Sequence, residues 1–332
     1  MRISQEEAAR VLGCLAPGER RRINALASGS HIVSRAMAVR LSDILEMGSI
    51  GPRNAAYQAH APVLLAEAAQ KLFDRNGDSD CGHVGCLVTS SCTGYSIPGL
   101  GVQLANDLGL PASATRLPIT ESGCAGGVVA IARAADFVRS HPGLSALTAA
   151  VELCSLAFHP GGNEGNLTSA LIFADGAGAA LIESGPGAGV ELLDASSTLI
   201  PDSAHLLGFD LTDAGFYPSL DRRLGDVLAE AIGPAVARLL GRNGMTCADV
   251  GGWLIHPGGA RILAKVEQRL GLRAEQTRWS WDSLAANGNT SSAAIFDVIA
   301  RYMAEPAPPG QHVVVVGFGP GVSIELFLGR SS

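Results

Sequence analysis

The chain has 332 residues, of which 47% are hydrophobic, and a formal net charge of -7. This length allows one large domain or two fused domains with a sizeable core. The net negative charge and the lack of a dense Lys/Arg block argue against nucleic-acid binding and against attachment to an anionic membrane surface. The start, MRISQEEAARVL, lacks the apolar run of a signal peptide, and no segment reaches the roughly 18 apolar residues of a membrane span. We therefore expect a cytoplasmic protein with no membrane partner and no nucleic-acid partner.

Apolar strands alternate with helices along the chain. The first part predicts helices at 5–12 and 61–73, a strand at 84–89, a helix at 100–108, a strand at 114–119, a helix at 125–140, a strand at 144–153 and a hairpin of strands at 169–182. After the Gly-rich segment 185–189 the pattern begins again, with a strand at 190–199, helices at 225–240, 261–270 and 290–303, and strands at 252–256, 313–317 and 322–328. We predict an α/β protein of two related halves, 1–187 and 188–332, whose sheets are covered by helices on both faces.

The seven cysteines are scattered without paired spacing. In a chain of this size that pattern indicates reduced thiols rather than a disulfide framework. Cys81, His83 and Cys86 are close in sequence, but no second pair of ligands accompanies them. The sequence therefore predicts no metal ion and no cofactor.

Cys124 lies in ITESGCAGGVVA, where an apolar strand-like run gives way to a helix of small residues. Unpaired N–H groups and the dipole at a helix start favour negative charge, so we expect a lowered thiol pKa there. Gly123, Gly126 and Gly127 keep the approach to the sulfur open. Cys124 is thus a candidate nucleophile, although many free cysteines serve only as small core residues.

His256 and Asn289 complete a set of chemical groups that can act together. His256 ends a buried strand in WLIHPGG, and Asn289 precedes a helix in NGNTSSA. Taken alone, His256 could equally be a structural histidine, and Asn289 could equally be a helix N-cap. Together with Cys124 they supply a nucleophile, a proton carrier and an amide donor. The thiolate can take an acyl group as a thioester, and the other two can stabilise the enolate formed when a carboxylated extender loses carbon dioxide, at about 3 kcal/mol for each donor.

Four segments carry a resemblance to a known family, namely ESGCAGG, WLIHPGGARIL, NGNTSSA and GFGPGVSIEL. They resemble motifs of the type III polyketide synthases, the chalcone synthase-like members of the thiolase-fold condensing enzymes, and STLIPDS with GFDLTDAGF resembles a segment of bacterial members. The resemblance implies a thiolase-like fold in which two βαβ-type halves form an αβαβα five-layer arrangement. It further implies an acyl-CoA starter loaded on Cys124, condensation with malonyl-CoA decarboxylated at His256 and Asn289, and cyclisation or release. No phosphopantetheine-bearing segment is present, so free CoA thioesters are the expected substrates.

The same resemblance assigns residues around the active site. The substrate pocket and its gate are expected at Cys92, Ile97, Cys154, Ala157, Val190, Leu240, Ser291, Gly317, Gly319 and Pro320. Val190 and Leu240 would replace the family's two gating phenylalanines and widen the passage, which suits a long fatty-acyl starter and an alkylpyrone or alkylresorcinol product. Ile97 is expected to reach into the partner subunit's pocket in a homodimer. Arg22 is the counterpart of a basic residue that holds the CoA phosphates.

Two other functions remain as alternatives. An initiating β-ketoacyl synthase would use acyl carrier protein for one condensation, and HPGG with GFGPG argues against it. A catalytically idle paralogue would act as a scaffold, which the intact Cys, His and Asn argue against. A dinucleotide site is excluded because too few residues follow Gly321 to complete a βαβ unit. The chain also begins at a helix where the family has a central strand of the first sheet, so we expect a truncated start or another segment in that place.

Overall fold

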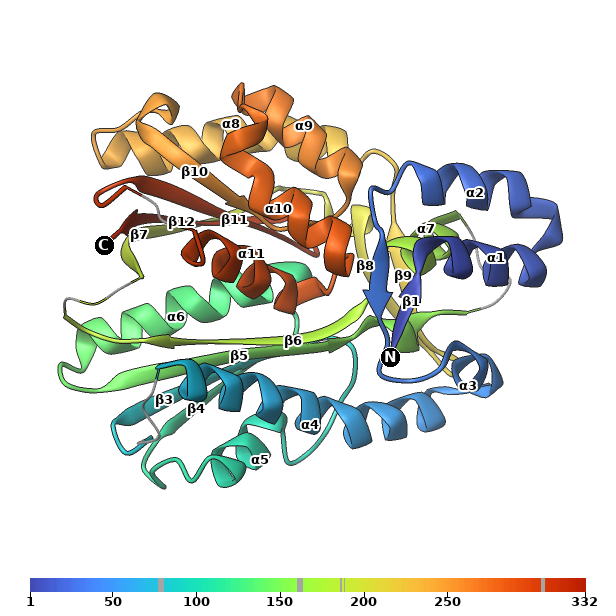
Figure 1. The fold of residues 1–332 in the computed structure, drawn as a ribbon, viewed down its shortest axis with the longest axis horizontal. Helices are drawn as coiled ribbons and strands as arrows, with labels where there is room; N and C mark the ends of the chain where they lie inside the picture. The colour runs from blue at the N-terminus through green and yellow to red at the C-terminus, as the bar shows by residue number, and fades with distance from the viewer. Residues whose placement is uncertain (77–80, 160–163, 186, 188, 306–307) are drawn as a thin grey trace.

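Two β-sheets form the second and fourth layers of the computed structural model, which describes residues 1–76, 81–159, 164–185, 187, 189–305 and 308–332. Helices lie between the sheets and on both outer faces (Figure 1). The layers therefore follow the αβαβα order that the sequence implies. The expected boundary between 187 and 188 falls beside residues 186 and 188, which lie outside the described chain.

The N-terminal sheet has four strands in the order β4-β3-β5-β6. These strands are β4 (Thr115–Ile119), β3 (Val84–Ser90), β5 (Ser145–Leu153) and β6 (Asp175–Ile182). β3 is parallel to β4 and β5, while β6 is antiparallel to β5. Every residue of β5 is buried, as expected for a central strand with helices on both faces. The outer helices α4 (Ile50–Asn76) and α5 (Leu100–Asp107) cover one face of this sheet.

No vacant place is found in the described part of the N-terminal sheet. The sequence analysis expected a truncated start or another segment in the place of the family's central strand, and in the structure β3 and β5 pair directly, with Leu87 opposite Leu147. The backbone groups of both strands therefore have ladder partners. At the chain start, β1 (Arg2–Ser4) pairs with β2 (Ser34–Ala36) in a separate small ribbon, and α1 (Gln5–Leu15) follows it.

The C-terminal sheet has the order β10-β11-β12-β7. Its strands are β10 (Val250–Ile255), β11 (His312–Gly319), β12 (Ser323–Ser331) and β7 (Val190–Leu199). As in the first sheet, a parallel pair is followed by an antiparallel neighbour. Its outer face is covered by α8 (Leu224–Arg242) and α9 (Ala260–Leu270), while α10 (Ala274–Asn287) packs beside the edge strand β10 and against α11 (Ala294–Met303) (Figure 1).

The middle layer consists of α6 (Gly126–Ser140) and α11 (Ala294–Met303), which lie between the two sheets (Figure 1). Each follows a single 3₁₀ turn, η2 (Gly123–Ala125) before α6 and η6 (Ser291–Ala293) before α11. The two helix starts touch so closely that a Cβ on Gly127 would lie 2.2 Å from the Ser292 carbonyl oxygen. The starts of both helices are thereby fixed relative to each other.

Several short elements surround the end of the sheets at which the middle helices begin. They are α2 (Arg20–Ser28), α3 (Leu41–Glu46), η3 (Cys154–Ala157), α7 (Glu164–Ile172), β8 (Leu207–Thr212) and β9 (Gly215–Leu220). The predicted hairpin of strands at 169–182 is wrong in its first half, because α7 continues to Ile172. A short apolar run such as LTSALI fits a helix or a strand equally well.

Candidate active site

A cavity of about 440 Å³ contains the three candidate chemical groups. Cys124 comes from η2, His256 from the end of β10 and Asn289 from the loop before η6. These residues lie far apart in sequence and belong to different layers, yet they line one cavity. The structure thus brings together the three residues that the sequence selected.

The glycine-rich loop after β11 supports the turn that carries Cys124. Gly123 has φ 48° and a Cβ there would lie 2.5 Å from Pro320 Cδ. A Cβ on Gly319 would lie 2.7 Å from the Ser122 carbonyl oxygen. These glycines allow the two loops to approach at a distance that side chains would prevent. The turn is therefore held from behind by this loop.

This arrangement corrects three expected pocket residues. Gly317, Gly319 and Pro320 pack behind the turn of Cys124 and do not line the cavity of about 440 Å³. The residue of the loop that does line it is Phe318. In a strand, neighbouring residues point to opposite sides. Phe318 therefore faces the cavity while the glycines on either side of it face the turn.

Burial dominates the ionisation of Cys124. It raises the pKa of the thiol to about 11, while hydrogen bonds from the Ser291 and Asn289 side chains act in the opposite direction. The lowered pKa predicted from the helix start is therefore wrong for this structure, because desolvation of the thiolate outweighs those hydrogen bonds. Cys124 is therefore a neutral thiol at pH 7, and to act as a nucleophile it would have to lose its proton.

His256 is held by the C-terminal sheet and is 1% exposed. Its N–H donates to the Val316 carbonyl oxygen at 2.7 Å, and its own carbonyl accepts from Gly258 N–H at 2.8 Å. Burial lowers the pKa of the imidazole to about 4, so the ring is neutral at pH 7. Within the described chain neither ring nitrogen has a hydrogen-bond partner. The ring can therefore accept a proton on one nitrogen and donate one from the other.

Asn289 is 2% exposed and is fixed through its backbone and its side chain. Its Oδ1 accepts from Ser291 N–H at 2.8 Å, and its Nδ2 donates to the Gly258 carbonyl oxygen at 3.3 Å. The backbone N–H donates to Ile172 O and the backbone carbonyl accepts from Ala174 N–H, both at 2.9 Å. The second Nδ2–H is the one that acts on the Cys124 thiol, so a ligand oxygen in the cavity would replace the Cys124 sulfur as its acceptor.

A buried carboxylate lies beside this group. Glu152 on β5 is 0% exposed and accepts hydrogen bonds from Cys92 N–H at 3.0 Å, Thr93 Oγ1 at 2.9 Å, Ser291 Oγ at 3.3 Å and Ser292 Oγ at 2.5 Å. Burial raises the pKa of Glu152, and the hydrogen bonds oppose that rise. The Cys92 thiol also lies 3.4 Å from Glu152 Oε1. Cys92 and Ser291 are thus next to the active site but are bound to this carboxylate.

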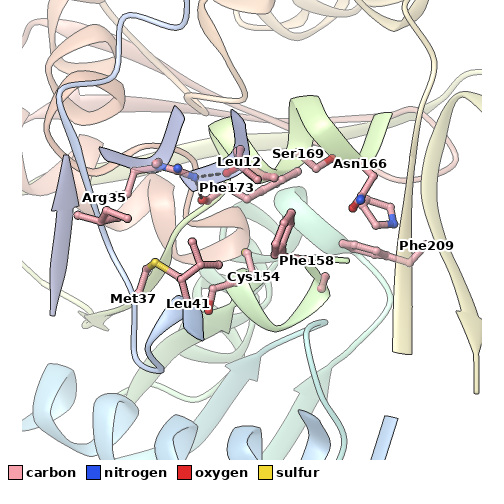
Figure 2. A pocket seen from close by; sticks show the side chains of 16 residues that line it. Leu12, Arg35, Met37, Leu41, Cys154, Phe158, Asn166, Ser169, Phe173 and Phe209 are labelled. Atoms are coloured by element: carbon pink, nitrogen blue, oxygen red, sulfur yellow. Dashed lines mark hydrogen bonds between the residues drawn. The ribbon is translucent and has the colours of Figure 1, made fainter. Parts of the chain in front are cut away.

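A smaller cavity of about 40 Å³ contains two further expected pocket residues, Cys154 and Ala157 (Figure 2). Phe173 lines this cavity and also the larger one. It lies between α7 and β6, and its neighbours Ile172 and Ala174 are hydrogen-bonded to Asn289. Sequence analysis missed Phe173, although a single aromatic residue at the end of an apolar run before Asp-Gly was a usable signal.

The two expected gate residues lie elsewhere. Val190 begins β7, where it is paired with Ser331, and Leu240 belongs to α8 and is 1% exposed. Neither lines the larger cavity, whose aromatic walls are Phe173 and Phe318. The sequence analysis located the gate by counting residues from the matched motifs. This count led to residues on β7 and α8, which do not line the larger cavity. The widened passage inferred from two aliphatic residues is therefore not found.

The basic residues at the larger cavity also differ from expectation. Arg22 lies 3.7 Å from Glu19 within its own turn and does not line the cavity. Arg222 and Arg261 do line it, and Arg261 is 3.6 Å from Asp226. Among the described residues no ion pair of Arg222 is found. The cavity therefore has cationic side chains that the sequence did not select.

Ile97 is 79% exposed and does not line either cavity of its own chain.

Among the described residues, no group of three His, Cys, Asp or Glu side chains is arranged to hold a metal ion. Of the described helices, none is both long enough and apolar enough to cross a membrane.

Comparison with known proteins gives a consistent result over the whole chain. The family model for the N-terminal domain of chalcone and stilbene synthases matches residues 32–186, and that for the C-terminal domain matches 191–332. A 1,3,6,8-tetrahydroxynaphthalene synthase of Streptomyces peucetius is 33% identical over 96% of this chain and 86% of its own. An alpha-pyrone synthesis polyketide synthase-like protein of Mycobacterium tuberculosis is 30% identical over 95% of this chain and 83% of its own.

A solved structure shows the same fold. The crystal structure of 1,3,6,8-tetrahydroxynaphthalene synthase from Streptomyces coelicolor, described as a bacterial type III polyketide synthase, superposes with a TM-score of 0.94. The match covers 100% of this chain and 96% of that chain at 29% sequence identity.

Proposed function

Because the chain belongs to the chalcone and stilbene synthase family, the type III polyketide synthases, we propose that it extends an acyl group carried on Cys124 by condensation with malonyl-CoA. The observation that carries this proposal is the presence of Cys124, His256 and Asn289 in one cavity of about 440 Å³. The cavity supplies a nucleophile, a proton acceptor and an amide donor. Cyclisation or release of the chain would complete the reaction.

The loading step uses Cys124 and His256. The Cys124 sulfur attacks the thioester carbonyl carbon of acyl-CoA, the bond from that carbon to the CoA sulfur breaks, and the acyl group remains as a thioester on Cys124. The proton of the buried thiol passes to the neutral His256 ring, which has no competing hydrogen-bond partner in the described chain. The leaving CoA thiolate then takes up that proton.

The extension step uses His256 and Asn289 as donors. Malonyl-CoA loses carbon dioxide, and the negative charge of the resulting enolate oxygen is stabilised by an imidazole N–H and by the Nδ2–H of Asn289 that otherwise faces the Cys124 sulfur. The enolate carbon attacks the thioester on Cys124, the carbon–sulfur bond to the enzyme breaks, and a β-ketoacyl-CoA longer by two carbons is formed. Each donor is worth about 3 kcal/mol when it is fixed before the charge develops.

The CoA phosphates are proposed to bind Arg222 and Arg261 instead of Arg22. Both side chains line the cavity that holds the nucleophile, and Arg222 has no ion pair among the described residues. A guanidinium group recognises phosphate well because its fork of N–H groups matches two phosphate oxygens.

A homodimer is proposed from the exposed apolar side chains near the cis peptide Ile97–Pro98. Ile97 is 79% exposed and Tyr95 is 62% exposed. Large apolar side chains grouped on a surface are typical of protein contacts. In this arrangement Ile97 enters the partner subunit's cavity, as the family resemblance implies.

Intact-protein mass spectrometry tests the proposed function. Purified protein is incubated with a panel of acyl-CoAs, with malonyl-CoA, and with acyl carrier protein thioesters, beside the Cys124→Ala variant. We expect a mass increase equal to the acyl group in the parent protein and none in the variant. The preferred acyl group then identifies the starter.

Two outcomes would contradict the proposal. An adduct formed only from acyl carrier protein thioesters would indicate a β-ketoacyl synthase. Folded protein that forms no adduct with any thioester would indicate a scaffold. Cys92→Ala is the matched control, because this thiol lies beside the active site but is bound to Glu152. Its adduct should match that of the parent.

A further inference from the structure

The backbone of His256 decides where its ring points. Within the described chain neither ring nitrogen has a hydrogen-bond partner, so no side chain fixes the imidazole directly. The ring packs closely on the turn that follows it, because a Cβ on Gly258 would lie 3.4 Å from His256 Cδ2 and 3.6 Å from Nε2. The direction of an imidazole N–H in the cavity therefore depends on how the backbone of residues 255–258 is held.

The strand that ends at this turn is paired on one side only. In the described part of the C-terminal sheet β10 is an edge strand, with β11 as its single neighbour. On that side His256 N–H donates to the Val316 carbonyl oxygen at 2.7 Å. Successive N–H groups of a strand point in opposite directions, so the N–H of Ile255 points away from β11. Ile255 is 0% exposed, so this N–H needs a partner inside the protein.

Ser280 of α10 supplies that partner. Its Oγ accepts from Ile255 N–H at 2.9 Å, and the side chain is 0% exposed. Near the start of the same strand, Gln276 Nε2 of α10 donates to the Val250 carbonyl oxygen at 3.0 Å. Side chains of a helix thus make hydrogen bonds to this edge of the sheet that a further strand would otherwise make.

The same segment of the chain also holds the turn after the His256 ring. Asn289 lies just beyond the C-terminal end of α10, and its Nδ2 donates to the Gly258 carbonyl oxygen at 3.3 Å. Gly258 N–H in turn donates to the His256 carbonyl oxygen at 2.8 Å. The segment therefore contacts the backbone before the ring through Ser280 and after the ring through Asn289. One helix sets the spacing between the imidazole donor and the amide donor.

We propose that Ser280 is a positioning residue, which holds the His256 ring at the place where it and Asn289 can donate to the same enolate oxygen. This inference rests on the proposed function, in which both side chains stabilise that oxygen. Two donors act together only when both reach one atom, and a displacement of about 1 Å can cost about a hundredfold in rate. Ser280 does not line the larger cavity, and it acts through the backbone of Ile255.

The Ser280→Ala variant tests this role. Without Oγ the buried Ile255 N–H has no acceptor, so the turn must shift to find another partner. The assay is the decarboxylation of malonyl-CoA, in which the enolate takes up a proton and acetyl-CoA and carbon dioxide are formed. We expect kcat to fall at least about tenfold and KM to stay within about twofold, because the donors stabilise the enolate more than the bound thioester. An unchanged kcat, or an effect on KM alone, would overturn the proposal.

Thr277→Val is the matched control for a general loosening of α10. Thr277 lies on the same helix and is 0% exposed, but its hydroxyl donates to Glu267 on α9. The change removes a buried hydrogen bond with little change of shape. We expect calorimetry to show a lower melting temperature, as for Ser280→Ala, with kcat and KM unchanged. An equal loss of kcat in both variants would show that loosening of the helix explains the effect, and the proposal would fail.

A double-mutant cycle shows whether Ser280 acts through the imidazole. In the His256→Ala background, Ser280→Ala should change the remaining decarboxylation rate by less than about twofold, because the ring that it positions is absent. A further tenfold loss would overturn the proposal. If Ser280→Ala does not fold, Ser280→Cys takes its place in every arm, since sulfur fills the site but is a weak acceptor.

The same assays separate this inference from the proposed function. A folded parent protein that neither decarboxylates malonyl-CoA nor forms an acyl-enzyme would refute the proposed function. An active parent with an equally active Ser280→Ala variant would refute only the role of Ser280.

Discussion

The close contact between the two middle helices predicts a large effect of Gly127→Ala. A Cβ there would lie 2.2 Å from the Ser292 carbonyl oxygen and 2.7 Å from Ile295 Cγ2. Such overpacking costs up to about 3 kcal/mol, and the higher helix propensity of Ala offsets about 1 kcal/mol. A chain of 332 residues loses about 0.7 kcal/mol of stability per degree near its midpoint, so we expect a melting temperature lower by about 3 °C.

The same substitution should slow condensation at least tenfold, because α6 carries the turn of Cys124 and the contacted oxygen belongs to the turn after Asn289. Calorimetry and the rate of malonyl-CoA consumption measure the two effects. Gly241→Ala is the matched control, since this helical glycine has no atom within 4 Å of an added Cβ. Its melting temperature should be unchanged or slightly higher. If Gly127→Ala matched the parent in both stability and rate, the described contact between the helices would be wrong.

Two further predictions concern substrate binding and chemistry. Arg222→Ala and Arg261→Ala should each raise the KM for acyl-CoA about fivefold, since an exposed ion pair is worth up to about 1 kcal/mol. The KM for the matching N-acetylcysteamine thioester, which has no phosphate, should stay constant; an equal rise for both substrates would count against phosphate binding. Asn289→Ala should lower malonyl-CoA decarboxylation at least about 10²-fold yet leave acyl loading intact, whereas His256→Ala should slow both steps. Normal loading in the His256 variant would exclude that ring as the proton acceptor.

The chemical groups were predictable because each has a local signature. Cys124 follows the apolar strand-like run at 114–119, which is the mostly exposed edge strand β4 in the structure, His256 follows the buried strand β10, and Asn289 precedes a helix. Their meeting was less predictable from these local signatures, because Cys124 follows a strand of the N-terminal sheet and His256 follows a strand of the C-terminal sheet. The five-layer fold followed from the family resemblance of the same segments, and the alternation of strands and helices agreed with it.

The helix α10 was not predictable from apolar spacing. Its buried face includes Thr277, Ser280 and Ser283, each at most 1% exposed. These side chains make hydrogen bonds inside the protein, as when Ser280 Oγ accepts from Ile255 N–H at 2.9 Å. A helix that buries hydroxyl groups has little of the apolar periodicity on which sequence analysis depends.

The cavity walls were the least predictable part of the site. Phe173 reaches both cavities because the segment around it pairs with Asn289, more than a hundred residues later in the sequence. Similarly, Arg222 and Arg261 reach the larger cavity from the starts of two different helices, α8 and α9. Positions of this kind depend on tertiary contacts, so a count of residues from the nearest motif cannot locate them.

Glu152 links the two sheets in a way that affects how the enzyme assembles. The carboxylate belongs to β5 of the N-terminal sheet, but Ser291 and Ser292, which donate to it, come from the other half of the chain. Until that half docks, the carboxylate must keep water as its partner, because a charge without partners is costly to bury. When the C-terminal half docks, Glu152 gains its serine donors, and the same contact places Asn289 beside Cys124. In a chain whose two halves had not docked, Glu152 would lack its two serine donors and Cys124 would lack Asn289 beside it.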